Sequence, residues 1–92
     1  MVVDKIHEKI REDLIKNQKE LLNLKHYYTH KYRSQNRFLD INVGIFKIGN
    51  VSHVVQIYVA DKHTKIRERL IMSNNQIVDT DIIVKRINEI TN

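Results

Sequence analysis

The first third of the chain repeats its apolar residues every three or four positions, apart from one gap of seven. This spacing places them in one stripe along a helix, because an α-helix turns through about 100° per residue. Asp4, at the start of this segment, is a suitable N-cap. We therefore predict one long amphipathic helix over residues 1–32. Its stripe consists of Val3, Ile6, Ile10, Leu14, Leu21, Leu24 and Tyr28.

This predicted helix is longer than the sheet it would cover. Residues 3–30 would extend about 40 Å as a helix, whereas a strand of about ten residues extends about 33 Å. Either the helix breaks near Asn17 or Asn23, or part of it projects and needs a partner. Asn17 falls on the stripe, where a lone Asn can fix the register of paired helices; alternatively, it lies at the stripe's edge in water. Ile15 and Leu22 form a second apolar spot on a different side of the helix. The predicted homodimer interface consists of Ile15, Asn17 and Leu22.

Polar and apolar positions alternate over residues 37–72, which is typical of half-buried strands. Three strands are predicted, at residues 38–45, 55–59 and 64–72, with turn residues at 48–50 and 61–63 between them. The third is the least regular, because Glu68 falls on its inner side. Residues 64–72 fit a helix that begins at Asp61 as an alternative.

The chain closes with a predicted helix over residues 79–91. Asp79 or Thr80 is its expected cap. The predicted order of helix, three antiparallel strands and helix gives a single domain over residues 1–92, an α+β two-layer sandwich. Both helices would cover one face of the sheet and leave the other open to water. The buried face of the last helix is predicted to contain Ile82, Ile83, Ile87 and Ile90.

Composition excludes several classes of site. The chain has no Cys, which removes disulfides, thiolate zinc sites and cysteine nucleophiles, and its two glycines are too few for a phosphate-binding loop. Its 92 residues can bury one modest core. No apolar run approaches the roughly 18 to 20 residues that span a bilayer, and the charged N-terminal segment is no signal peptide. We expect a cytoplasmic protein that does not contact membranes.

The histidines offer one weak metal motif. His26 and His30 have the i, i+4 spacing that can hold zinc on a helix. The Glu that would act as general base is replaced by Tyr27, and a third ligand would require His53 or His63 to fold back. Hydrolase motifs are also missing. We predict no metal site, no cofactor and no enzymatic activity, and expect the two histidines to extend a basic patch at low pH.

The net charge of +5 is concentrated in two segments. Residues 23–38 contain four basic and no acidic residues, and residues 61–70 contain a second basic cluster. In a three-stranded meander, the linker around Arg33 and the hairpin around Lys62 share one edge of the sheet. Tyr58, on the neighbouring strand, could stack on a base. The predicted nucleic-acid-binding residues are Lys25, Lys31, Arg33, Arg37, Tyr58, Lys62, Lys65, Arg67 and Arg69.

Two functions fit this charge distribution. The first is a small non-enzymatic protein that binds nucleic acid, DNA or RNA, as a dimer formed through the first helix. Each phosphate that such a patch neutralises releases condensed counterions. The second is a protein-binding inhibitor, adaptor or assembly component from a phage or other mobile element, which binds an acidic partner surface. The many Ile, Lys and Asn residues, typical of low-GC genomes, suit such an origin. Both partners satisfy the same electrostatics.

Overall fold

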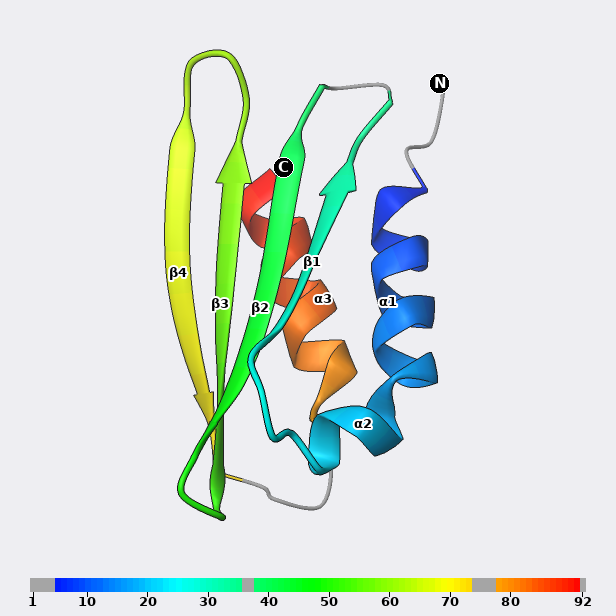
Figure 1. The fold of residues 1–92 in the computed structure, drawn as a ribbon. Coiled ribbons are helices and arrows are strands. Elements are labelled where there is room, and N and C mark those ends of the chain that lie inside the picture. The colour runs from blue at the N-terminus through cyan, green and yellow to red at the C-terminus, as the bar shows by residue number, and fades with distance from the viewer. Residues whose placement is uncertain (1–4, 36–37, 74–77, 92) are drawn as a thin grey trace.

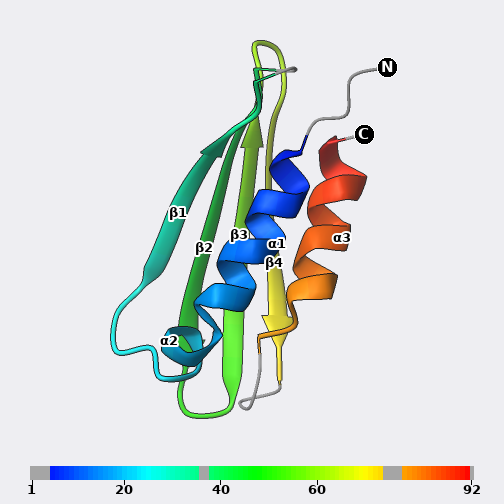
Figure 2. The same ribbon diagram turned by 90° about the vertical axis from the view of Figure 1, so that its right-hand side faces the viewer.

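The chain forms a four-stranded sheet with its helices packed against one face (Figures 1 and 2). This computed structural model describes residues 5–35, 38–73 and 78–91. The strands are antiparallel, in the order β1-β2-β3-β4. The predicted α+β class, with a helix near each end, is confirmed, but the predicted three strands are wrong. The elements are α1 (Ile6–Lys16), α2 (Gln18–Leu22), β1 (Tyr28–Arg33), β2 (Asp40–Ile48), β3 (Ser52–Ala60), β4 (Lys65–Met72) and α3 (Thr80–Thr91).

The extra strand comes from the end of the predicted long helix. The helix breaks at both expected places: α1 ends at Asn17, whose Nδ2 donates to the Asp13 carbonyl oxygen at 2.8 Å, and α2 ends at Asn23. Tyr28, predicted on the helical stripe, instead begins β1. Residues 27–33 contain three Tyr and one Thr, residue types common in strands, and the pairing of residues 28–33 with β2 selects the strand. The predicted Val3 and Asp4 lie outside the described residues.

Side chains from the sheet hold the C-terminal end of α2. The last carbonyl groups of a helix have no partner within the helix. His53 Nε2 lies 3.1 Å from the Leu21 carbonyl oxygen, and Lys47 Nζ donates to the Leu22 carbonyl oxygen at 2.7 Å. His53 is fully buried, so it supports α2 and does not fold back toward His26 and His30.

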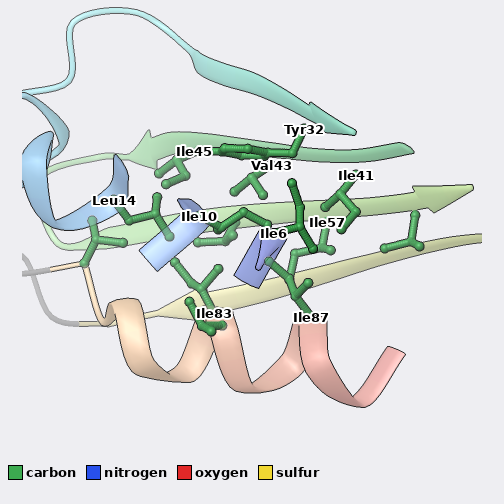
Figure 3. Packing of buried hydrophobic residues seen from close by; sticks show 14 of the residues in the cluster. Ile6, Ile10, Leu14, Tyr32, Ile41, Val43, Ile45, Ile57, Ile83 and Ile87 are labelled. Carbon is green, nitrogen blue, oxygen red and sulfur yellow. The ribbon is translucent and has the colours of Figure 1, made fainter. Parts of the chain in front are cut away.

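The core lies between the sheet and the helices (Figure 3). The predicted buried face of the last helix is wrong at one position: Ile82 is 50% exposed, and Val84 is buried in its place. This is a consequence of helical spacing, since Ile83, Val84 and Ile87 share the side of α3 opposite Ile82. Asp79 is confirmed as the cap, because its Oδ1 accepts from the Ile82 N–H. The core includes Ile6, Ile10, Leu14, Ile41, Val43, Ile45, Ile57, Ile83 and Ile87.

Residues 65–72 form a strand, as predicted, and the structure explains the charge that interrupts its pattern. Glu68 faces the helices and forms a bidentate ion pair with Arg86 of α3. The ion pair satisfies a carboxylate on the covered side of β4. Hydrogen bonds to both Glu68 and Glu89 raise the pKa of Arg86, which keeps its positive charge.

The two long helices run antiparallel and are joined by polar side chains. His7, near the start of α1, lies 3.0 Å from Thr91 Oγ1 at the end of α3. At the other end, the Gln18 amide nitrogen donates to the Val78 carbonyl oxygen at 2.7 Å and to Thr80 Oγ1 at 2.9 Å. Gln18 Oε1 accepts from the Val78 N–H. Within the described ranges, no helix has the length and apolar character needed to cross a membrane.

Candidate nucleic-acid interface

The face of the sheet turned away from α1 and α3, here called the open face, is rich in basic side chains. Neighbouring residues of a strand point to opposite faces. Ile41 and Ile57 are buried under the helices, so their neighbours Asn42 and Tyr58 lie on the open face. The strand register then aligns two rows across the sheet. One row is Arg33, Asp40, Ala60 and Lys65, and the next is Lys31, Asn42, Tyr58 and Arg67.

The structure brings most of the predicted residues together at one end of this face. The β1–β2 connection and the β3–β4 hairpin lie at the same end of the sheet, at the top of Figure 1. A hollow of about 270 Å³ there is lined by Arg33, Phe38, Asp40, Asp61 and Lys62. The predicted approach of the linker to the hairpin therefore holds with four strands. We call this the basic end: Lys31, Arg33, Tyr58, Lys62, Lys65, Arg67 and Arg69.

A second hollow, of about 440 Å³, lies on the open face beside the rows just described. Lys31, Arg33, Asp40 and Tyr58 are among the residues that line it. The guanidinium carbon of Arg67 lies 5.4 Å from the centre of the Tyr58 ring, within the range of a cation–π contact. Tyr58 thus presents an aromatic surface between basic side chains.

Asp40 neutralises little of this charge. Arg33 Nε lies 4.0 Å from Asp40 Oδ1, and both side chains are mostly exposed. An ion pair of this kind is worth about 0 to 1 kcal/mol, so Arg33 can exchange Asp40 for a phosphate at little cost.

Acidic side chains lie mainly in the helical layer. Those on α1, α2 and α3 are held away from the open face, and Glu68 points toward α3. The two sides of the sheet therefore differ in charge, with the open face positive. The acidic residues of the helices are Glu8, Glu12, Asp13, Glu20, Asp81 and Glu89.

The opposite end of the open face is apolar. The Tyr27 ring lies across Gly44, where a Cβ atom would come within 1.7 Å of the Tyr27 hydroxyl. Its hydroxyl donates to Gln56 Oε1 at 3.4 Å, and its ring centre lies 5.9 Å from that of Phe46. We call this the apolar end: Tyr27, Phe46, Ile48, Val54 and Ile71.

Two residues of the predicted set are not counted in the basic end. Lys25 is exposed in the segment before β1, at the end of that strand opposite Arg33. Arg37 lies outside the described residues.

The histidine prediction is wrong for His30. Its ring is on the covered side of β1, 4.5 Å from the Tyr32 ring, and Nε2 lies 3.9 Å from Asp13 Oδ2. His30 therefore does not extend the basic end. The i, i+4 spacing of His26 and His30 brings two side chains together only on a helix, and here His26 lies in a loop and His30 in β1. In the described part of the chain, no group of three His, Cys, Asp or Glu residues is arranged to hold a metal ion.

Two tyrosines on the covered side of β1 do not take part in the open face. Burial is the main cause that raises the pKa of both Tyr28 and Tyr32, and the nearby Asp13 carboxylate adds to it. Both phenols stay protonated near neutral pH.

The predicted dimer residues lie in the helical layer. Ile15 is 56% exposed on α1, whereas Leu22 on α2 is half-buried. Asn17 is occupied within its own chain, where it ends α1. Of the two alternatives for the long helix, a break or a projecting part, the structure shows the break at this residue. Ile15 is left as the exposed apolar residue of this predicted interface.

Sequence reasoning missed the aromatic residues Tyr27, Phe38 and Phe46. Reading residues 27–33 as a strand would have placed Tyr27 on the same face as Lys31 and Arg33. The alternation of β2 places Phe46 on the open face, but it does not predict that the Tyr27 ring lies next to it.

Comparisons of the chain with protein-family models, with curated proteins and with solved structures gave no match.

Proposed function

We propose that the basic end of the open face binds nucleic acid through its phosphate backbone. The observation that carries this proposal is the pair of rows on an uncovered face, in one of which Tyr58 and Arg67 are cross-strand neighbours and Lys31 lies beyond Asn42. Lysine and arginine neutralise phosphates and release counterions, while an aromatic ring on the same face offers a stacking surface. The protein needs no catalytic group for this role, and it would act in the cytoplasm.

The combination of charge and aromatic surface favours nucleic acid over an acidic protein. An acidic protein surface would use the positive charge, whereas a nucleic acid supplies both phosphates for the charge and bases that can stack on the Tyr58 ring. The second candidate, an inhibitor or adaptor that binds an acidic protein, draws support from the apolar end. Tyr27 is 50% exposed there and Ile71 is 68% exposed, and exposed apolar groups of this kind suit protein partners.

Salt-dependent binding tests the proposal. Fluorescence anisotropy with labelled single-stranded and duplex oligonucleotides would be measured over a range of salt concentrations. If about four phosphates are neutralised, affinity for a single strand falls about 50-fold between about 50 and 200 mM salt. Light scattering on the same samples measures the proposed dimer.

A matched pair of variants separates a specific surface from net charge. Arg67→Glu with Arg69→Glu reverses two charges of the basic end and is expected to weaken binding at least about tenfold at low salt. Lys9→Glu with Lys85→Glu makes the same change in net charge on exposed residues of the helical layer. This control is expected to lose much less affinity. Absence of wild-type binding at low salt, or equal losses in both variants, would overturn the proposal.

A further inference from the structure

Phe38 is an aromatic residue at the basic end that contributes little to the core. Its side chain is 63% exposed, and it does not belong to the cluster of buried residues. Its φ of +53° lies in the left-handed region, which is unfavourable for a bulky side chain. Gly49, at φ +58°, is the other described residue in this region, and there the chain uses glycine. Burial therefore does not explain why this position is aromatic.

The backbone on the C-terminal side of Phe38 is anchored. Leu39 is buried, and its carbonyl oxygen accepts from the Ser34 N–H at 2.9 Å, which closes the connection between β1 and β2. Ser34 is itself buried. The exposed ring is thus attached to a fixed point of the fold, and this reduces the entropy that a ligand contact would cost.

The surroundings of Phe38 match a nucleotide. The ring lines the 270 Å³ hollow together with Arg33 and Lys62, two donors for phosphate oxygens. Asp61, in the same hollow, accepts from the backbone N–H groups of His63 and Thr64 at 2.7 and 2.6 Å, so its carboxylate supports the hairpin turn. Asp40 also lines the hollow, but its contact with Arg33 is long and exposed, so Arg33 remains available to a phosphate. Two cationic groups and an exposed aromatic residue therefore converge at one place.

We infer that Phe38 is a base-stacking residue and that the ligand of the basic end is a single-stranded nucleic acid. An unpaired base would lie on the Phe38 ring while the adjacent phosphates contact Arg33 and Lys62. A base inside a duplex is already stacked on both faces and does not offer a ring to Phe38. This inference rests on the function proposed above and narrows its ligand to unpaired strands.

The strained backbone gives the inference an unusual test, because stability and binding should change in opposite directions. Phe38→Gly removes the unfavourable left-handed side chain and is expected to raise the melting temperature. The same variant loses the stacking surface and is expected to bind a short oligothymidine roughly tenfold more weakly. Affinity for a duplex of the same length should change little. A structural role for Phe38 would instead lower the melting temperature.

A tryptophan placed at this position reports stacking directly. The chain contains no Trp, so Phe38→Trp gives a protein with one indole. Its fluorescence is expected to be quenched by oligothymidine and not by the duplex or by heparin. Ile82→Trp is the matched control, since Ile82 is 50% exposed on α3, in the helical layer. Its fluorescence should not respond to the oligonucleotide.

The outcomes distinguish the two proposals. If wild-type protein binds no oligonucleotide at low salt, the proposed function fails and this inference fails with it. If wild-type protein binds with the expected salt dependence but the fluorescence of Phe38→Trp is unchanged, the function stands and the inference is overturned. Equal affinity of Phe38→Gly and wild type for oligothymidine, or a preference of the wild type for duplex, also overturns it. Quenching at position 38 alone, with weaker binding by Phe38→Gly, supports it.

Discussion

The two faces of the sheet differ in what explains their residues. On β3, Ile57 is fully buried beneath the helices, while its neighbour Tyr58 lies on the open face between basic side chains. Packing accounts for the covered face, since each apolar residue there removes surface from water. Folding makes no such demand on the basic end of the open face. Charges on β1 and β4 also discourage edge-to-edge association, but this does not account for the aromatic ring of Tyr58.

Paired substitutions on β3 test this difference most strongly. Ile57→Ala leaves a cavity under the helices and is expected to lower the free energy of unfolding by about 3 to 4 kcal/mol. Tyr58→Ala, one residue away on the other face, should lower it by about 1 kcal/mol or less. Urea denaturation measures both.

Binding should show the reverse order for these variants. Tyr58→Ala is expected to weaken oligonucleotide binding, whereas Ile57→Ala should bind normally under conditions in which it remains folded. A destabilisation by Tyr58→Ala as large as that by Ile57→Ala would show that the open face belongs to the core and would break the comparison.

Most of the covered face could be predicted from the sequence. The one large error in that prediction, a helix in place of β1, has a clear cause. Ile6, Ile10 and Leu14 repeat at helical spacing, and β2 and β3 alternate cleanly, so local patterns identify them. The sequence around residues 27–33 is compatible with both structures: Tyr28 continues the helical stripe, and residues 28, 30 and 32 also fall on one face of a strand. Their pairing with β2, a contact distant in sequence, decides between these, and no local pattern contains it.

On the open face, the sequence predicted residue positions correctly where the order and direction of the strands alone determine them. A reversal of the chain after β3 brings Lys65 back toward Arg33 whether the sheet has three strands or four. The positive φ of Phe38 had no sequence marker, because left-handed positions are recognised by Gly or Asn. The contact of Tyr27 with Gly44 likewise depends on the fold, since a glycine within a strand does not reveal which ring lies across it.

A smaller contrast should appear between two glutamines. Gln18→Ala removes the partners of both the N–H and the carbonyl oxygen of Val78, a residue buried between the layers. Leaving these groups unsatisfied is expected to lower the free energy of unfolding by about 1 to 2 kcal/mol. Gln56→Ala is the control on the open face, where the amide accepts one long hydrogen bond from Tyr27 and should lose about 0.5 kcal/mol or less. Equal losses would mean that polar contacts stabilise both faces alike.

The smallest expected effect concerns pH and the covered side of β1. Burial raises the pKa of Tyr32, and the neighbouring Tyr28 and Asp13 add to this, so the folded protein keeps a proton that the unfolded chain releases above about pH 10. The unfolded state then binds fewer protons, and stability falls as the pH rises. At about pH 10.5 this loss is about 0.8 kcal/mol for one tyrosine, and Tyr32→Phe removes it. Urea denaturation of both proteins should therefore give free energies whose difference is constant below about pH 9 and changes in favour of Tyr32→Phe above about pH 10. Parallel curves throughout would show that the Tyr32 phenol reaches water like an open-face side chain, and the difference between the two sides of β1 would not hold.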